Sequence, residues 1–125
     1  MATILVIEDD RAFRDLLRLH LRQAGHAVQV AADPEEGLRS LIDTPPDMIL
    51  LDLDLPYLSG FEVLEALRKD PTSGKIPVVI VTGHAEEEVH ERCRGIGIDG
   101  YLTKPFKSEH LVQAINRALA VHEKK

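Results

Sequence analysis

Short, strongly apolar segments alternate with amphipathic segments along the whole chain. Residues 4–7, 48–51 and 77–82 are almost entirely apolar, and runs of this length and composition are typical of strands buried on both faces of a sheet. Residues 27–31 and 99–103 predict two shorter strands. We therefore expect five strands spread over the whole chain.

A segment with helical spacing of apolar residues follows each predicted strand. Gly25 ends the first such segment, and Asp33 before Pro34 is typical of a helix start. A third helix is expected over residues 59–69, and a mostly polar fourth helix over about residues 85–94. The side chains expected to face the core from the helices are Phe13, Leu16, Leu17, Leu21, Ala24, Leu38, Leu41, Ile42, Val63, Leu64, Leu67, Leu111, Ile115 and Leu119.

Five strands that alternate with five helices predict an α/β fold. Parallel strands need crossover connections, so we expect a flavodoxin-like, doubly wound (βα)5 sheet with strand order 2-1-3-4-5. In such folds ligands bind beyond the carboxyl ends of the strands. The residues expected at those ends are Glu8, Asp9, Asp52, Thr82 and Lys104.

Composition narrows the class of protein further. The 125 residues fit one domain, which we expect to span residues 1–125. With 15 basic and 21 acidic residues the net charge is −6, which disfavours direct binding to nucleic acid or to an anionic membrane. One cysteine excludes an internal disulfide, and neither a signal peptide nor a membrane span is recognisable. We therefore expect a cytoplasmic domain.

The predicted strand ends carry an unusual concentration of charge. Glu8, Asp9 and Asp52 would repel one another without a counter-charge, and Mg²⁺ prefers such oxygen ligands. Lys104 adds a positive charge and Thr82 adds a hydroxyl donor. Phosphoryl transfer depends on this kind of positioning and charge neutralisation, and a carboxylate can itself accept the phosphoryl group. Asp52, on the central strand, is the best candidate acceptor.

Four motifs, in this order and spacing, resemble the receiver domain of two-component response regulators. They are ILVIEDD at 4–10, LLDLDLP at 50–56 followed by Gly60, VTG at 81–83 and YLTKPF at 101–106. The resemblance covers nearly the whole chain. It implies the flavodoxin-like fold and a function as a phosphoacceptor in signal transduction.

The resemblance also implies a role for each site residue. Asp52 would accept the phosphoryl group, Asp9 would bind Mg²⁺ directly, and Glu8 would act through water. Asp54 would give the metal its backbone carbonyl.

The remaining motif residues would contact the phosphoryl group or respond to it. Thr82 and Lys104 would contact it, Tyr101 would change rotamer on activation, and the Lys104–Pro105 peptide bond would be cis. The implied donor is a phosphohistidine on a sensor histidine kinase or on a histidine phosphotransfer protein. A downstream protein partner would bind the face made by the helix over about 85–94, the strand 99–103 and the last helix.

Asp54 and His84 each follow a site residue by two positions. Side chains two apart in a strand point the same way, so Asp54 should flank Asp52 and face His84 across the mouth of the site. We expect this pair to orient the water that hydrolyses the phosphoryl group.

Two other functions remain as alternatives. The sequence Asp52-Leu53-Asp54 also resembles the DxD motif of haloacid-dehalogenase-like phosphatases, which would make the protein a turnover enzyme. That motif lies on the third predicted strand rather than near the N-terminus, and Pro56 follows it. A receiver that only binds partners is disfavoured because every site residue is present. We therefore expect a protein that catalyses its own phosphorylation and dephosphorylation but does not turn over a substrate.

Overall fold

The computed structural model describes residues 2–54 and 59–123. Its five strands form one parallel sheet in the order β2-β1-β3-β4-β5, which confirms the predicted topology. The strands are β1 (Thr3–Ile7), β2 (Ala27–Ala31), β3 (Met48–Leu51), β4 (Val78–Thr82) and β5 (Gly100–Thr103).

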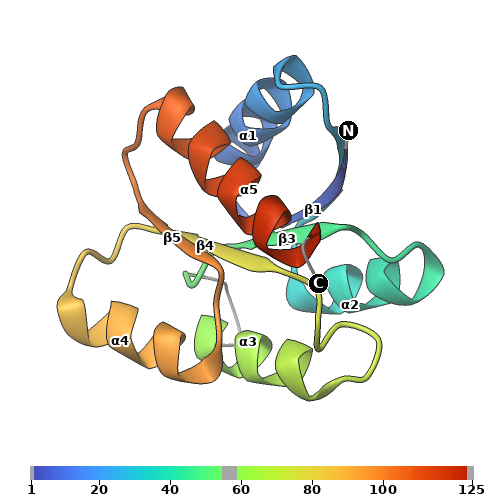
Figure 1. Cartoon of the computed structure of the whole chain (residues 1–125), viewed down its shortest axis with the longest axis vertical. Coiled ribbons are helices and arrows are strands. Elements are labelled where there is room, and N and C mark those ends of the chain that lie inside the picture. Colours follow the sequence, from blue (N-terminus) through green and yellow to red (C-terminus); the bar gives the residue numbers. More distant parts are fainter. Residues whose placement is uncertain (1, 55–58, 124–125) are drawn as a thin grey trace.

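Five helices cover both faces of the sheet. Helices α1 and α5 lie on one face, and α2, α3 and α4 lie on the other (Figure 1). Within the described residues, no helix is both long enough and apolar enough to cross a bilayer. The helices are α1 (Arg11–Gln23), α2 (Pro34–Asp43), α3 (Gly60–Lys69), α4 (Glu87–Ile96) and α5 (Ser108–Glu123).

The core has one layer on each side of the sheet, because alternate strand residues point to opposite faces. The layer beneath α1 and α5 contains Ile4, Val6, Leu17, Leu21, Met48, Leu50, Val79, Val81, Leu111, Ile115 and Ala118. The layer beneath the other three helices contains Leu5, Ile7, Ala31, Leu41, Ile49, Leu51, Leu53, Val63, Leu64, Leu67, Val78, Ile80 and Cys93. Strands buried on both faces explain the uninterrupted apolar runs in the sequence.

Side-chain caps fix where three of the helices begin. The carboxylates of Asp10 and Asp33 accept backbone N–H groups at the starts of α1 and α2, and the Ser59 hydroxyl does so at the start of α3. The predicted start at Asp33 is confirmed. Helix α4 begins at Glu87 rather than at residue 85, because Glu86 keeps an extended backbone and makes no side-chain cap. Gly97, with φ of 120°, follows the last residue of α4.

Three residues predicted to face the core are exposed. Leu16 is 44% exposed and Ile42 is 74% exposed, because each lies one position, or about 100° of helix rotation, from the buried Leu17 or Leu41. Ala24 is also exposed, since it is the C-cap of α1. The core stripe of these two helices is therefore narrower than the sequence suggested.

Gly60 holds the segment that follows Asp52 against the start of α3. Its N–H donates to the Leu53 carbonyl oxygen at 3.2 Å. A Cβ at this position would lie 2.4 Å from the Leu53 Cα atom, which no side chain tolerates. The absence of a side chain at Gly60 therefore allows the backbone beside Asp52 to pack directly on α3.

Candidate functional site

The carboxyl ends of four adjacent strands bring the predicted site residues together. Glu8 and Asp9 follow β1, Asp52 follows β3, Thr82 ends β4 and Lys104 follows β5. Because β1, β3, β4 and β5 are neighbours in the sheet, residues far apart in sequence meet at one edge. Leu55 and Pro56, which complete the second motif, lie outside the described residues.

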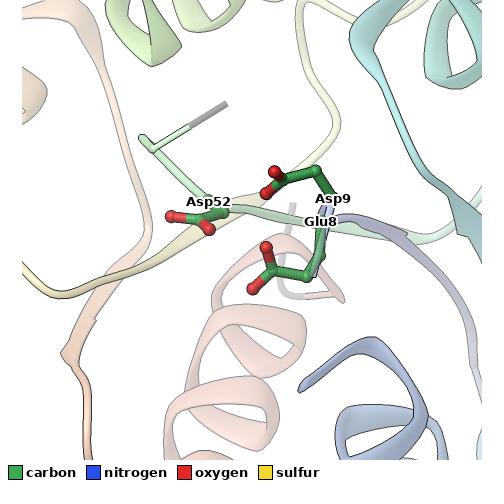
Figure 2. A group of neighbouring side chains, drawn as sticks. All are labelled: Glu8, Asp9 and Asp52. Atoms are coloured by element: carbon green, nitrogen blue, oxygen red, sulfur yellow. The ribbon is translucent and has the colours of Figure 1, made fainter. Parts of the chain in front are cut away.

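Three carboxylates form an acidic cluster at this edge. One oxygen each of Glu8, Asp9 and Asp52 lies within 4.8 Å of the others, and the cluster is formed by the ends of β1 and β3 (Figure 2). Glu8 and Asp52 are buried, at 1% and 4% exposure, whereas Asp9 is exposed. Burial, together with the neighbouring Asp52 carboxyl, raises the pKa of Glu8 well above its ordinary value.

Lys104 supplies the positive charge between the two buried carboxylates. Its Nζ atom lies 2.8 Å from Glu8 Oε1 and 3.0 Å from Asp52 Oδ2. It also lies 4.1 Å from the centre of the Phe13 ring, and the Phe106 ring packs edge-on against Phe13. Burial alone would lower the pKa of Lys104, but its hydrogen bonds to the two carboxylates raise it above the ordinary value. The ammonium group therefore stays charged and fixed beside Asp52.

Backbone and side-chain groups of Asp54 connect Asp52 with Thr82. The Asp54 N–H donates to Asp52 Oδ1 at 2.9 Å, so both oxygens of the Asp52 carboxylate have a donor. The Thr82 hydroxyl, which is fully buried, donates to Asp54 Oδ2 at 3.3 Å. Thr82 thus remains part of β4 and its side chain faces the site.

His84 faces Asp54, as the sequence predicted. Its Nε2 atom lies 2.7 Å from Asp54 Oδ1, and this contact raises the pKa of the His84 imidazole. The His84 carbonyl accepts the Tyr101 hydroxyl at 2.6 Å, and the Tyr101 ring stacks on His90 at 4.3 Å. No pattern in the sequence indicated the contact between Tyr101 and His90. The Lys104–Pro105 peptide bond is cis, as the resemblance implied.

The chemistry of these groups suits a hard cation and a phosphoryl group. Within residues 2–54 and 59–123, the cluster of Glu8, Asp9 and Asp52 is the one group of three such side chains with converging ligand atoms. Carboxylate oxygens are the donors that Mg²⁺ prefers, so the residues present fit that metal. The Lys104 ammonium, which lies beside the buried Asp52 carboxylate, and the Thr82 hydroxyl are donors of the kind that a transferring phosphoryl group needs. The protein is therefore of the doubly wound α/β class, and its site has the groups that a metal-assisted phosphoryl transfer needs.

The chain belongs to the response regulator receiver domain family, whose model matches residues 4–116. It is 39% identical over 121 residues to the DNA-binding dual master transcriptional regulator RpaA of Synechocystis. The aligned residues make up 95% of this chain and 49% of RpaA. It is 32% identical over 117 residues to the phosphate regulon transcriptional regulatory protein PhoB of Pseudomonas aeruginosa, and the alignment covers 94% of this chain and 51% of PhoB. The chain spans about half the length of the curated relatives it matches.

Solved structures agree with this family. A CheY-like response regulator receiver domain protein from Methanospirillum hungatei superimposes with a TM-score of 0.91 at 31% identity, covering 99% of this chain and 98% of that one. The chain is therefore a receiver domain of the two-component type, and phosphotransfer is the known function of that family. Receiver domains bind Mg²⁺ at an acidic pocket and interact with histidine kinases and output domains. The family membership separates the chain from the haloacid-dehalogenase-like phosphatases.

Proposed function

We propose that Asp52 accepts a phosphoryl group from a phosphohistidine of a sensor histidine kinase or histidine phosphotransfer protein. The environment of its carboxylate carries this proposal. Asp52 is 4% exposed, the Asp54 N–H fixes one oxygen, and the Lys104 ammonium lies 3.0 Å from the other. A carboxylate held in this way is oriented for attack and has a counter-charge for the product.

The proposed reaction exchanges one bond to phosphorus for another. A carboxylate oxygen of Asp52 forms a bond to phosphorus as the phosphorus–nitrogen bond of the phosphohistidine breaks, and the imidazole leaves with the bonding electron pair. Lys104 and Thr82 stabilise negative charge on the phosphoryl oxygens. Glu8, Asp9 and Asp52, with the backbone carbonyl of Asp54, would hold Mg²⁺, which neutralises charge on the transferring group when bound.

Each chain would accept one phosphoryl group, so the phosphorylated chain itself would serve as the signal and no substrate would be turned over repeatedly. We infer that residues 1–125 act as one receiver unit in the cytoplasm, without direct contact to nucleic acid or membrane. Thr82, Tyr101 and Pro105 would form the switch that responds to Asp52. The face of α4, β5 and α5 would bind the downstream protein partner. The weak anchoring of α4 supports this choice, because the helix buries only Cys93 and lacks a side-chain cap.

Labelling with a small phosphodonor tests the acceptor directly. Incubation with acetyl phosphate and Mg²⁺ should add one phosphoryl group to the unaltered chain and none to the Asp52→Asn variant, measured by intact mass spectrometry. Asp54→Asn tests the neighbouring carboxylate as an alternative acceptor and should still be labelled, and Asp15→Asn, exposed on α1, is the matched control. Labelling of Asp52→Asn, or its loss only in Asp54→Asn, would reject Asp52 as the acceptor. An unaltered chain that is never labelled would instead favour a receiver that only binds partners.

Asp9 should be needed for metal binding. Partners in the outer shell of metal sites already change affinity by about 10- to 100-fold when mutated, so Asp9→Ala should weaken Mg²⁺ binding by at least about tenfold. Calorimetry measures this, and Asp10→Ala is the control because Asp10 caps α1 instead. Equal Mg²⁺ affinity in the unaltered chain and in Asp9→Ala would contradict the proposed metal site.

Phe13 should help to hold Lys104 in place, since its ring lies against the ammonium. A cation–π contact is worth about 0.5–2 kcal/mol, so Phe13→Leu should slow labelling of Asp52 by about two- to thirtyfold. Phe13→Tyr keeps an aromatic face and should retain most of the rate. If Phe13→Leu and Phe13→Tyr are labelled at the same rate, the aromatic face is not what positions Lys104.

A further inference from the structure

The Thr82 hydroxyl donates its hydrogen bond to the Asp54 carboxylate and not to the Asp52 carboxylate. It donates to Asp54 Oδ2 at 3.3 Å and accepts the His84 N–H at 3.3 Å. Thr82 is fully buried, so its hydroxyl needs a partner within the protein. Asp54 therefore accepts the hydrogen bond of the Thr82 hydroxyl, the same hydroxyl that would donate to a phosphoryl oxygen in the proposed function.

A hydroxyl carries one hydrogen, so Thr82 can donate either to Asp54 or to a phosphoryl oxygen on Asp52. We propose that the Asp54 carboxylate is a positioning residue that latches Thr82 in the unphosphorylated arrangement, and that phosphorylation must break this hydrogen bond. This inference rests on the proposed function of Asp52. The latch concerns the side chain of Asp54, whereas its backbone carbonyl is the group assigned to the metal.

His84 connects the Asp54–Thr82 hydrogen bond with Tyr101 on the edge strand β5. Its ring contacts Asp54 at 2.7 Å, its N–H donates to Thr82, and its carbonyl accepts the Tyr101 hydroxyl at 2.6 Å. When Thr82 turns toward a phosphoryl group, the His84 N–H loses alignment with its acceptor. The carbonyl that holds Tyr101 belongs to the same residue. Asp54 thereby couples the position of Thr82 to that of Tyr101 on the edge strand β5.

Beryllofluoride, a phosphoryl analogue that is not hydrolysed, measures the latch without interference from dephosphorylation. With Mg²⁺ present, Asp54→Ala should bind beryllofluoride about three- to tenfold more tightly than the unaltered chain, the range of one net hydrogen bond. Binding is followed by NMR titration. In the free Asp54→Ala variant, the amide signals of Thr82, His84 and Tyr101 should shift toward their positions in the beryllofluoride complex.

A double variant distinguishes the loss of the Asp54–Thr82 hydrogen bond from the loss of the Asp54 charge. Removing the Asp54 charge favours an anion whether or not a latch exists, so the same change is made in a Thr82→Val background, where no hydroxyl can be held. The latch predicts that most of the tightening disappears there. Glu86→Ala is the matched control, because Glu86 is the other carboxylate on His84, at 3.4 Å from Nδ1, and it should leave the affinity unchanged.

Two results would overturn the latch while leaving the proposed function intact. One is equal tightening by Asp54→Ala in both backgrounds, and the other is no tightening at all in a chain that binds beryllofluoride. Failure of the proposed function has a different signature. It would appear as an unaltered chain that does not bind beryllofluoride, or as equal binding by the Asp52→Asn variant.

Discussion

Replacing Lys104 by methionine should slow phosphorylation of Asp52 by about a hundredfold or more, the usual effect of removing one preorganised donor from a charge-stabilising site. The Lys104 ammonium lies 2.8 Å from Glu8 and 3.0 Å from Asp52, in a setting with little solvent. Methionine keeps a long apolar stem against Phe13 but has no charge. The variant therefore removes the electrostatic contribution with little change in packing. The rate is followed by intact mass spectrometry after addition of acetyl phosphate.

Lys107→Met is the matched control for this experiment. Lys107 is exposed and three residues away, so its loss should change the rate by no more than about twofold. Thermal melts followed by circular dichroism establish that Lys104→Met is folded, since the change leaves Glu8 and Asp52 facing each other without an intervening cation. A folded Lys104→Met variant that is labelled as fast as Lys107→Met would contradict the assigned role.

Arg68→Met should lower the free energy of unfolding by about 3 kcal/mol, because three partly buried carbonyl groups and the Asp99 carboxylate would lose a charged donor. The Arg68 side chain is 17% exposed and pairs with Asp99 at 3.2 Å. Its guanidinium also donates to three backbone carbonyls, at 2.7 Å to Gly97, 2.7 Å to Ile76 and 3.3 Å to Gly74. Arg68 thus joins α3 to the segments that lead into β4 and β5.

Arg39→Met is the control for the Arg68 substitution. Arg39 pairs with Glu35 at 2.9 Å on the exposed surface of α2, and such pairs contribute at most about 1 kcal/mol. Urea unfolding should therefore separate the two variants clearly, and Arg68→Met should melt on the order of 10 °C lower. Equal stabilities of Arg68→Met and Arg39→Met would show that the Arg68 hydrogen bonds are not stabilising.

Local patterns predicted the fold well because β1, β3 and β4 are buried on both faces, whereas the edge strands β2 and β5 are only partly buried. Residues 4–7, 27–31 and 48–51 were recognisable as strands, and Asp33 was recognisable as a helix cap. The order of the strands followed from the alternation of strands and helices. Once that order was known, the strand ends alone predicted that Glu8, Asp9 and Asp52 would come together. The functional roles of these residues stay predictions until they are measured.

Contacts between distant segments could not be predicted in the same way. Arg68 lies in the last turn of α3, where a basic residue is expected for local reasons, so nothing in the sequence indicated its long-range bonds. Phe13 fitted the core pattern of α1, and its contact with Lys104 depends on where the segment between β5 and α5 places that lysine. The expected start of α4 differs by two residues because Glu86, at the N-cap position, makes no side-chain cap, so the boundary has no local signal.

The most direct test of the central claim locates the phosphoryl group on the unaltered chain. Borohydride reduces an acyl phosphate to an alcohol, so a phosphorylated aspartate is converted to homoserine, which peptide mass spectrometry identifies by position. After labelling with acetyl phosphate and Mg²⁺, we expect homoserine at Asp52 alone, and none when the metal is removed with a chelator. Homoserine at Asp9 or Asp54 instead, or labelled protein with none at Asp52, would contradict this expectation.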